Sequence, residues 1–247
     1  MSVDPVALIT GGGRRIGAEI TRHLHQAGFN VLIHYLRSAE EAEQLAANLN
    51  NARPNSAKVL RADLNDMAQV KQLAEDAQKS WQRVDVLINN ASSYYPTEFG
   101  TVKESEWDDL LSSNTKAPFF LSQALAPALT AQQGAIVNIV DIHAQSPLAN
   151  YSPYTIAKAG NAMLTKSLAR ELAPAVRVNG VAPGVIIWPE KQAEHSQAEK
   201  DRILSQVPLA REGTASDIAK TVCFFVKDAP YITGQILAVD GGRSIFI

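Results

Sequence analysis

The sequence predicts a doubly wound α/β domain built around a seven-stranded parallel sheet. Short apolar runs alternate with longer segments of helical periodicity, which is the pattern of parallel strands joined by crossover helices. A glycine-rich turn follows the first apolar run. The chain has 247 residues, 46% of them hydrophobic, which is enough for one large core. The expected strands are residues 6–9, 30–34, 57–60, 84–88, 134–140, 176–181 and 235–239.

The first helix shows the expected periodicity, because Ile16, Ile20 and Leu24 fall on one face. Strands that are apolar throughout need cover on both faces, and right-handed crossovers place the ligand crevice at their carboxyl ends. We therefore expect one Rossmann-type domain over residues 1–247. The polar segment 186–205 interrupts the alternation of strands and helices, and we expect it to form a lid over the substrate.

The composition of the chain limits the kinds of molecule that the protein is expected to bind. A formal net charge of -2 gives no reason to expect nucleic acid or an anionic membrane, since both call for a basic excess. No apolar run reaches the roughly 18 residues of a membrane span. The single cysteine, Cys223, lies in an apolar segment and is expected in the core, which fits a reducing cytoplasm. The five histidines show no metal-ligand spacing, so no metal is expected.

The first strand leads into the glycine-rich turn, residues 10–17, which opens the first helix. In this position backbone N–H groups can approach a pyrophosphate. Arg15 stands where a glycine would let the backbone approach closely. Its planar guanidinium can instead reach over the phosphates and toward the substrate, the alternative being a solvated arginine at a helix start.

The second strand ends in residues 34–38, where a cofactor with a free ribose 2′-hydroxyl usually meets an acidic acceptor. No acid stands there. Arg37 and the Ser38 hydroxyl, with Arg14 across the crevice, would instead pair with a ribose 2′-phosphate. The sequence therefore predicts NADPH.

The third and fourth strands end in further candidate contacts. Asp63 could accept a hydrogen bond from the adenine amino group, or it could cap the helix that follows. Asn89 and Asn90 are expected to pack beside the adenosine ribose, with a simple turn as the alternative.

The fifth strand ends at Asp141, ahead of the pair Tyr154 and Lys158. Residues four apart share a helix face, so we expect the ammonium to lie near the phenol and favour its ionised form. An ionised carboxylate only accepts hydrogen bonds, which makes Asp141 a poor partner for a carbonyl oxygen. A nitrogen heterocycle that carries amino and ring N–H groups suits it better, and can take a proton through Tyr154.

Taken together, the glycine turn, residues 89–91, the Tyr-x-x-x-Lys pair, Pro183-Gly184 and residues 240–242 resemble the short-chain dehydrogenases/reductases over nearly the whole chain. Within that superfamily, residues 10–17, 34–38 and 89–97 and Asp141 together resemble the pteridine reductases. This resemblance implies NADPH-dependent reduction of dihydropterin to tetrahydropterin, with oxidised pterins and dihydrofolate as further candidates. It also implies a homotetramer, and the apolar end of the tail, residues 245–247, favours an oligomer as well.

The resemblance also implies roles for individual residues. Asp141 and Tyr154 would pass a proton to the pterin, and Lys158 would hold the nicotinamide ribose. Asn114 would support a water relay to the lysine, the alternative being a buried amide satisfied by backbone. The substrate contacts implied are Arg15, Ser92, Tyr94, Asp141, Tyr151 and Tyr154. The cofactor contacts expected overall are Gly11, Arg14, Arg15, Ile16, His34, Tyr35, Arg37, Ser38, Asp63, Leu64, Asn90, Ala91, Ser92, Lys158, Pro183 and Gly184.

The sequence departs from the pteridine reductase pattern at two places. Tyr94 replaces the phenylalanine of the best-known members, although it still offers a flat ring to stack on the pterin. Val185 and Ile186 stand where the family places a serine after Pro-Gly, which puts a hydroxyl contact at that point in doubt.

Two other functions remain open. The first is a carbonyl or enoyl-thioester reductase of the same superfamily, because Tyr151 and Lys158 have the wider spacing of enoyl reductases and Ser146 offers a displaced hydroxyl. The carboxylate of Asp141 counts against it, because it would repel a developing oxyanion. The second is an NADPH-binding module without turnover, because folds of this class also host such proteins.

Overall fold

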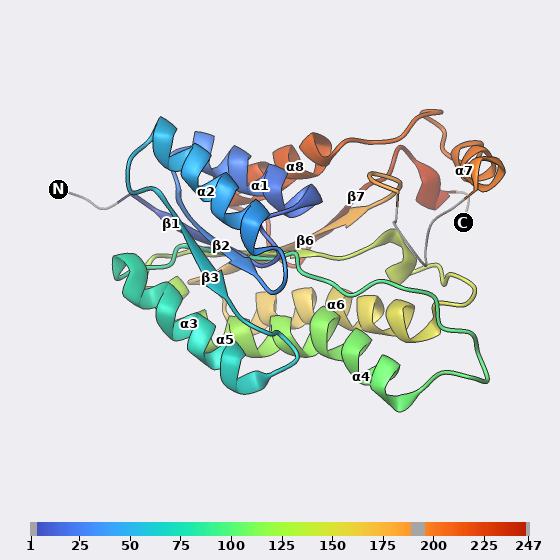
Figure 1. Ribbon diagram of the computed structural model, residues 1–247, viewed down its shortest axis with the longest axis horizontal. Helices are drawn as coiled ribbons and strands as arrows, with labels where there is room; N and C mark the ends of the chain where they lie inside the picture. The colour runs from blue at the N-terminus through green and yellow to red at the C-terminus, as the bar shows by residue number, and fades with distance from the viewer. Residues whose placement is uncertain (1–3, 189–195, 246–247) are drawn as a thin grey trace.

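Seven parallel strands form one sheet in the order β3-β2-β1-β4-β5-β6-β7 (Figure 1). The computed structural model describes residues 4–188 and 196–245. The strand order reverses between β1 and β4, which is where such sheets open a ligand crevice. All seven predicted strands are confirmed, and their bounds are β1 Val6–Ile9, β2 Asn30–Tyr35, β3 Ala57–Arg61, β4 Val86–Asn89, β5 Ala135–Ile139, β6 Arg177–Pro183 and β7 Ile236–Val239.

Helices cover both faces of this sheet, with α1, α2 and α8 on one side and α3, α5 and α6 on the other (Figure 1). A π-helical turn, η1, joins α4 to α5 without a break. The bounds are α1 Arg15–Gln26, α2 Ala39–Ala52, α3 Met67–Trp81, α4 Glu104–Leu111, η1 Ser112–Lys116, α5 Ala117–Ala131, η2 Ile142–Ala144, α6 Ser152–Glu171, α7 Gln197–Leu204, α8 Ala215–Lys227 and η4 Arg243–Ile245.

The core is divided by the sheet into two layers. Ile9 packs with the side chains of α1 and α8, whereas its neighbour Leu8 packs with those of α3 and α5, and both are fully buried. Successive side chains of a strand point to opposite faces, so a strand covered on both sides is apolar at nearly every position. This is why β1 appears in the sequence as an unbroken apolar run, and why β4 and β5 each contain a single polar residue, the buried Asn89 and Asn138.

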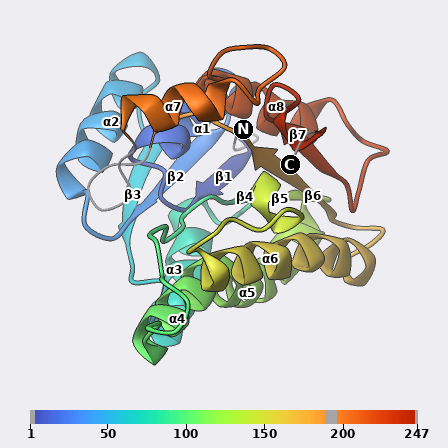
Figure 2. The ribbon, with the colours of Figure 1, turned by 90° about the vertical axis from the view of Figure 1, so that its right-hand side faces the viewer.

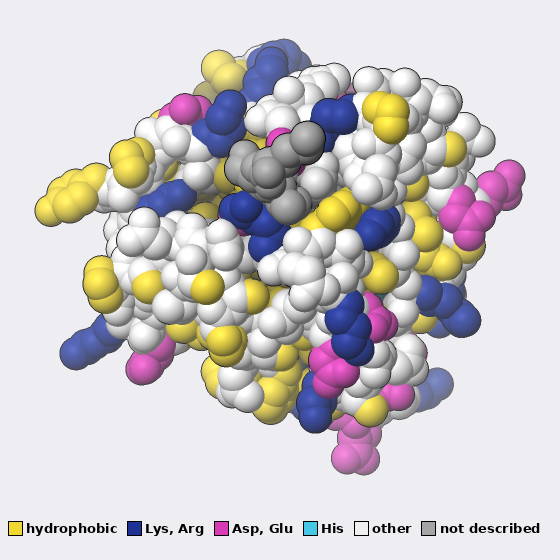
Figure 3. All heavy atoms as spheres, turned by 90° about the vertical axis from the view of Figure 1, so that its left-hand side faces the viewer, with side chains coloured by type: hydrophobic (Ala, Val, Ile, Leu, Met, Phe, Trp, Pro, Cys, Tyr) yellow, Lys and Arg dark blue, Asp and Glu magenta, His cyan; other side chains and the backbone are white. Residues whose placement is uncertain are grey.

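The loops that leave β4, β5 and β6 gather with α7 and η4 at the carboxyl edge of the sheet (Figure 2). The opposite face of the molecule carries basic and acidic side chains interspersed with apolar ones (Figure 3). In the predicted lid, α7 is a capped helix in which Ser196 accepts a hydrogen bond from the backbone of Glu199. Residues 189–195 of that lid lie outside the described residues, so its role stays a prediction.

No helix among the described residues combines the length and the apolar character that a membrane crossing needs. No group of three or more metal-ligating side chains occurs in the same part of the chain.

Candidate active site

Tyr154 and Lys158 lie in the first two turns of α6, and both are buried. The Lys158 ammonium donates a hydrogen bond to the Ile139 carbonyl at 2.9 Å, which ties α6 to the end of β5. Its Nζ lies 5.7 Å from the centre of the Tyr154 ring, so the two side chains share a face as their spacing predicts.

Asp141 follows β5 and is held at both oxygens. One oxygen accepts from the His143 backbone N–H at 2.8 Å, which caps η2. The other accepts a hydrogen bond of 2.6 Å from the Tyr154 hydroxyl. The carboxylate and the phenol, thirteen residues apart in the chain, therefore meet directly at the carboxyl edge of the sheet.

The pKa of Tyr154 is shifted in the direction opposite to the one that its spacing from Lys158 predicts. Burial raises the pKa of Tyr154 well above its usual value, and the charge of Asp141 raises it further. Burial and Asp141 therefore outweigh the attraction expected from the Lys158 ammonium, and a phenolate favoured by that lysine stays a prediction. Burial also lowers the pKa of Lys158 to about 8, against the opposing charge of Asp141. Tyr154 thus remains a proton donor, while the lysine can lose its proton near neutral pH.

Three tyrosines form the wall of the site. The rings of Tyr94 and Tyr151 stack with centroids 4.9 Å apart, and Tyr94 meets Tyr154 edge-on at 4.8 Å. The segment that carries Tyr94 is fixed to the loop before α6, because the Thr97 backbone N–H donates to the Asn150 carbonyl at 2.6 Å. Burial raises the pKa of Tyr94. The residues predicted to hold a flat ring therefore lie together beside Asp141.

Asn114 sits inside the π-helical turn η1, a conformation that often marks functional sites. Its amide nitrogen donates to the carbonyls of Ser93 (3.0 Å) and Leu110 (2.9 Å). Its amide oxygen is buried and has no hydrogen-bond partner among the described residues.

The glycine turn is built for close backbone packing. Gly11 has φ +60°, and a Cβ on Gly17 would lie 2.1 Å from the Gly11 carbonyl oxygen. The Asn90 side-chain amide donates to the Thr10 and Gly11 carbonyls at 2.9 and 3.2 Å. Its observed role is therefore to hold the turn, and a ribose contact stays a prediction.

His34 also holds the glycine turn in place through a hydrogen bond. Its Nδ1 accepts from the Gly11 backbone N–H at 3.1 Å, and Nε2 lies 3.1 Å from the Ala62 carbonyl. Burial lowers its pKa to about 4, so the ring is neutral and Nε2 carries the donated proton. With both ring nitrogens engaged, His34 positions backbone, and its predicted cofactor contact stays untested.

The proposed 2′-phosphate region lies at the start of α2. Arg37 is exposed, and Ser38 stands at the N-cap of α2 with no side-chain cap bond. Residues 34–38 carry no carboxylate, which fits a phosphorylated ribose. Arg14, half-exposed, lies 3.4 Å from Glu41 of α2, an acid that the sequence reasoning did not weigh.

Asp63 forms a local turn, because one of its oxygens accepts from the Asn65 backbone N–H at 2.9 Å. The cap of α3 is Asp66 instead, whose carboxylate accepts from the backbone of Ala68 and Gln69. The alternative that made Asp63 the helix cap is therefore wrong. Leu64 beside it is buried.

Arg15 adopts a left-handed backbone conformation, φ 51°, which strains a residue with a side chain. Its guanidinium donates to the carbonyls of Ile187 and Trp188, at 3.1 and 3.0 Å. It therefore bridges the glycine turn and the segment that follows Pro183-Gly184. A Cβ on Gly184 would lie 2.6 Å from that of Asp240, so glycine is needed where β6 meets the end of β7.

Sequence reasoning missed Arg243. It lies in η4, after β7, and its half-buried guanidinium is close enough to Asp141 and Tyr94 for their charges to act on its pKa, which burial lowers. Its Nε is buried without a hydrogen-bond partner in the described part of the chain. The rule that places sites at the carboxyl ends of parallel strands would have drawn attention to it.

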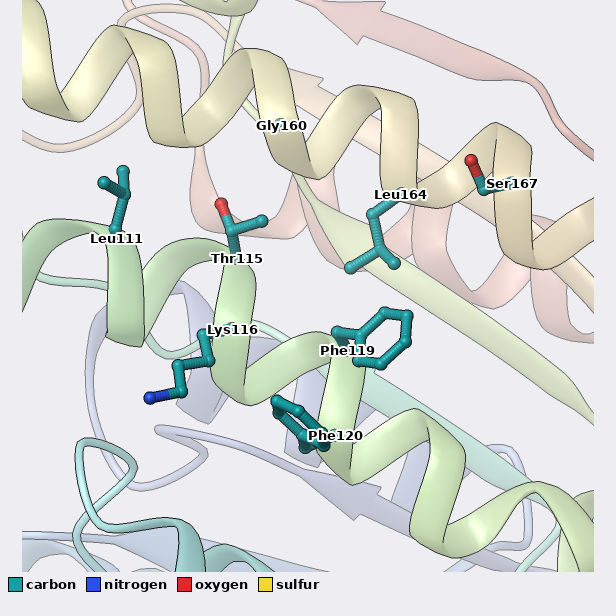
Figure 4. Close-up of a pocket in the computed structure, with 8 residues that line it drawn as sticks. All are labelled: Leu111, Thr115, Lys116, Phe119, Phe120, Gly160, Leu164 and Ser167. Carbon is teal, nitrogen blue, oxygen red and sulfur yellow. The ribbon is translucent and has the colours of Figure 1, made fainter.

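A hollow on the outer helices is distinct from this site. It lies between α5 and α6, and apolar side chains dominate its lining (Figure 4). Lys116 is the one ionisable side chain in its lining, and no carboxylate, histidine or tyrosine accompanies it there. Its lining residues are Leu111, Thr115, Lys116, Phe119, Phe120, Gly160, Leu164 and Ser167.

Comparisons with known proteins agree with this geometry. Residues 12–244 match a family model described as enoyl-(acyl carrier protein) reductase. The chain is 38% identical over 282 residues to pteridine reductase 1 of Leishmania tarentolae, covering 98% of this chain and 96% of that protein. It is 37% identical over 245 residues to the 3-oxoacyl-[acyl-carrier-protein] reductase FabG of Staphylococcus aureus strain Mu50, covering 98% of this chain and 99% of that protein. A putative ketoacyl reductase of granaticin polyketide synthase from Streptomyces violaceoruber is 33% identical over 246 residues, with 98% and 96% covered.

Proposed function

Because this chain belongs to the short-chain dehydrogenase/reductase family, and is an oxidoreductase of that class, we propose that it reduces pterins with NADPH. The proposed reaction takes dihydropterin to tetrahydropterin. Oxidised pterins and dihydrofolate are further candidate substrates. Similarity to the Leishmania pteridine reductase supports this proposal, and similarity to FabG is nearly as strong.

The observation that carries the proposal is the 2.6 Å hydrogen bond between Tyr154 and Asp141. An ionised carboxylate beside the acid group accepts from the amino and ring N–H groups of a pterin, whereas a carbonyl oxygen needs donors. Tyr154 remains protonated because its pKa is raised, so it can donate its proton to a ring nitrogen. The tyrosine wall offers π-surfaces against which a flat heterocycle can stack.

NADPH, when bound, would supply the hydride. The glycine turn and Arg15 would hold its phosphates, and Arg37 and Ser38 would hold its 2′-phosphate. Lys158 would donate to the nicotinamide ribose, because its Nζ is buried at the carboxyl edge with donors beyond its bond to Ile139. The other predicted cofactor contacts, including Ile16, Tyr35, Ala91 and Ser92, form part of the same proposal.

The second candidate is reduction of a carbonyl or enoyl group on an acyl thioester. The FabG relatives and the description of the matching family model favour it. The experiment that separates the two is a direct comparison of catalytic efficiency. Purified protein with NADPH is offered dihydrobiopterin or an acetoacetyl thioester, and loss of absorbance is followed. Turnover of the thioester alone would overturn the pterin proposal, and NADPH binding without turnover of either would favour a silent binding module.

We also propose that the protein works as a homotetramer in the cytoplasm. Large apolar side chains are exposed on the outer surfaces of α5 and α6, among them Phe119, Phe120 and Met163. Ile245 in the tail is 77% exposed. Apolar surface of this kind is typical of contacts between subunits. The lone Cys223, whose thiol pKa is raised to about 11 by burial, is suited to a reducing compartment.

A further inference from the structure

A second buried amide, Asn161, stands directly behind the predicted catalytic Asn114. It lies on α6 one turn beyond Lys158, and its side chain is 2% exposed. Its amide nitrogen donates to the Asn114 main-chain carbonyl at 2.6 Å. Asn161 therefore fixes the π-helical turn that carries Asn114, from the same helix that carries Tyr154 and Lys158.

The oxygens of these two amides are the unusual feature. Asn114 Oδ1 and Asn161 Oδ1 are both buried, and neither has a hydrogen-bond partner among residues 4–188 and 196–245. Only two other buried side-chain atoms in that part of the chain are without a partner. An unpaired buried acceptor costs about 1–3 kcal/mol, so each of these oxygens calls for a donor such as an ordered water.

Two other buried asparagines, Asn138 and Asn179, do not leave an amide oxygen unpaired. Asn138 accepts from Asn89 at 2.9 Å and donates to Thr165 at 2.9 Å. On β6, Asn179 donates to the Ile232 carbonyl at 2.8 Å and accepts from the Gln235 backbone at 3.1 Å. Asn138 and Asn179 are thus paired through both their nitrogen and their oxygen, whereas Asn114 and Asn161 each keep a buried oxygen without a partner in the described part of the chain.

We propose that Asn161 is a positioning residue for proton transfer, which together with Asn114 holds a buried water that serves Lys158 and Tyr154. A water can donate both of its protons to the two amide oxygens and still accept from the lysine. This inference rests on the proposed reduction, in which Tyr154 gives its proton to the substrate. The phenolate regains a proton by way of Lys158, the water returns one to the lysine, and solvent restores the water, so the site recovers its starting charge.

Two variants of the full chain test this role. Asn161→Leu keeps a similar volume and removes both the bond to the Asn114 carbonyl and the proposed bond to the water. We expect kcat to fall about tenfold with KM little changed, since ground-state binding is not touched. The solvent deuterium isotope effect on kcat should rise, because proton return becomes slower. In Asn161→Ser, the hydroxyl and the space for a second water restore the link, and we expect most of the turnover to be retained.

The matched control is Asn179→Ala, which removes a buried amide on β6 whose hydrogen-bond partners, Ile232 and Gln235, lie outside α6. It should lower the melting temperature without changing kcat per folded molecule. If Asn161→Leu behaves in the same way, the amide is only structural and the proposal is overturned. The substrate is whichever of dihydrobiopterin or the acetoacetyl thioester the unmodified enzyme reduces, so failure of the pterin assignment leaves this test intact.

A measurement independent of turnover completes the test. A high-resolution crystal structure of the unmodified protein should show an ordered water within hydrogen-bond distance of both Asn114 Oδ1 and Asn161 Oδ1. A map in which those oxygens bond to protein atoms instead would overturn the proposal.

Discussion

Replacing Asp141 with serine removes the only carboxylate bonded to Tyr154 in the described structure and substitutes the hydroxyl that a ketone enzyme would use. Serine can still accept from the His143 backbone, so the cap of η2 is kept. The bond that is lost is the 2.6 Å contact from the Tyr154 hydroxyl. Hydrogen bonds to a charged group contribute about 1.5–3 kcal/mol. If the transition state depends on that contact, the loss is roughly ten- to 150-fold in kcat/KM. We expect a fall on the order of a hundredfold for dihydrobiopterin, since the proton relay is lost as well.

The assay follows NADPH oxidation with dihydrobiopterin and, in parallel, with an acetoacetyl thioester. Loss of the carboxylate removes its repulsion of an oxyanion, so the ratio of the two efficiencies should shift toward the thioester. The control is Asp66→Ser, which exchanges the same side chains at the exposed cap of α3. Unchanged pterin kinetics in Asp141→Ser would refute the assigned role of the carboxylate, whatever the effect on stability.

Three further outcomes are expected. Arg37→Glu should shift the preference from NADPH toward NADH by more than about tenfold in kcat/KM, because a carboxylate repels the 2′-phosphate; an unchanged ratio would place the phosphate elsewhere. Because the pKa of Lys158 is lowered to about 8, its ammonium is lost as the pH rises through that value, and kcat/KM should decline above it. In Asp141→Ser this decline should move to lower pH, because the charge that raises the lysine pKa is gone. A decline at the same pH as in the unmodified protein would contradict the effect of Asp141 on Lys158. Light scattering at micromolar concentration should report a tetramer, and Phe119→Glu should weaken it, whereas a monomeric parent protein would contradict the proposal.

The strands could be predicted from the sequence to within about two residues because a sheet covered on both faces favours apolar side chains at most positions. The strand β7 is partly exposed, and it could be predicted because residues 236–239 are all apolar. The meeting of Asp141 with Tyr154 was also predictable. One residue ends a central strand and the other begins the next long helix, and right-handed crossovers bring both to the same edge.

Features that depend on packing between distant segments were not predictable in this way. His34 and Asn90 could be assigned to the nucleotide crevice, but nothing in their sequence neighbours shows that both side chains are used to hold the glycine turn. The same holds for Asp63 and Asp66, since both precede the helix and only the backbone conformation decides which one caps it.

The direction in which the Tyr154 pKa shifts depends on competing effects of charge and burial, which residue spacing alone does not determine. The Tyr-x-x-x-Lys pattern fixes the shared face and therefore predicts an attraction between ammonium and phenolate. Burial and the adjacent carboxylate act in the opposite sense, and together they prevail. In the proposed reaction, Asp141 keeps Tyr154 protonated until a substrate nitrogen replaces the direct 2.6 Å bond between them. Lys158, with Asn114 and Asn161 behind it, would then restore the proton.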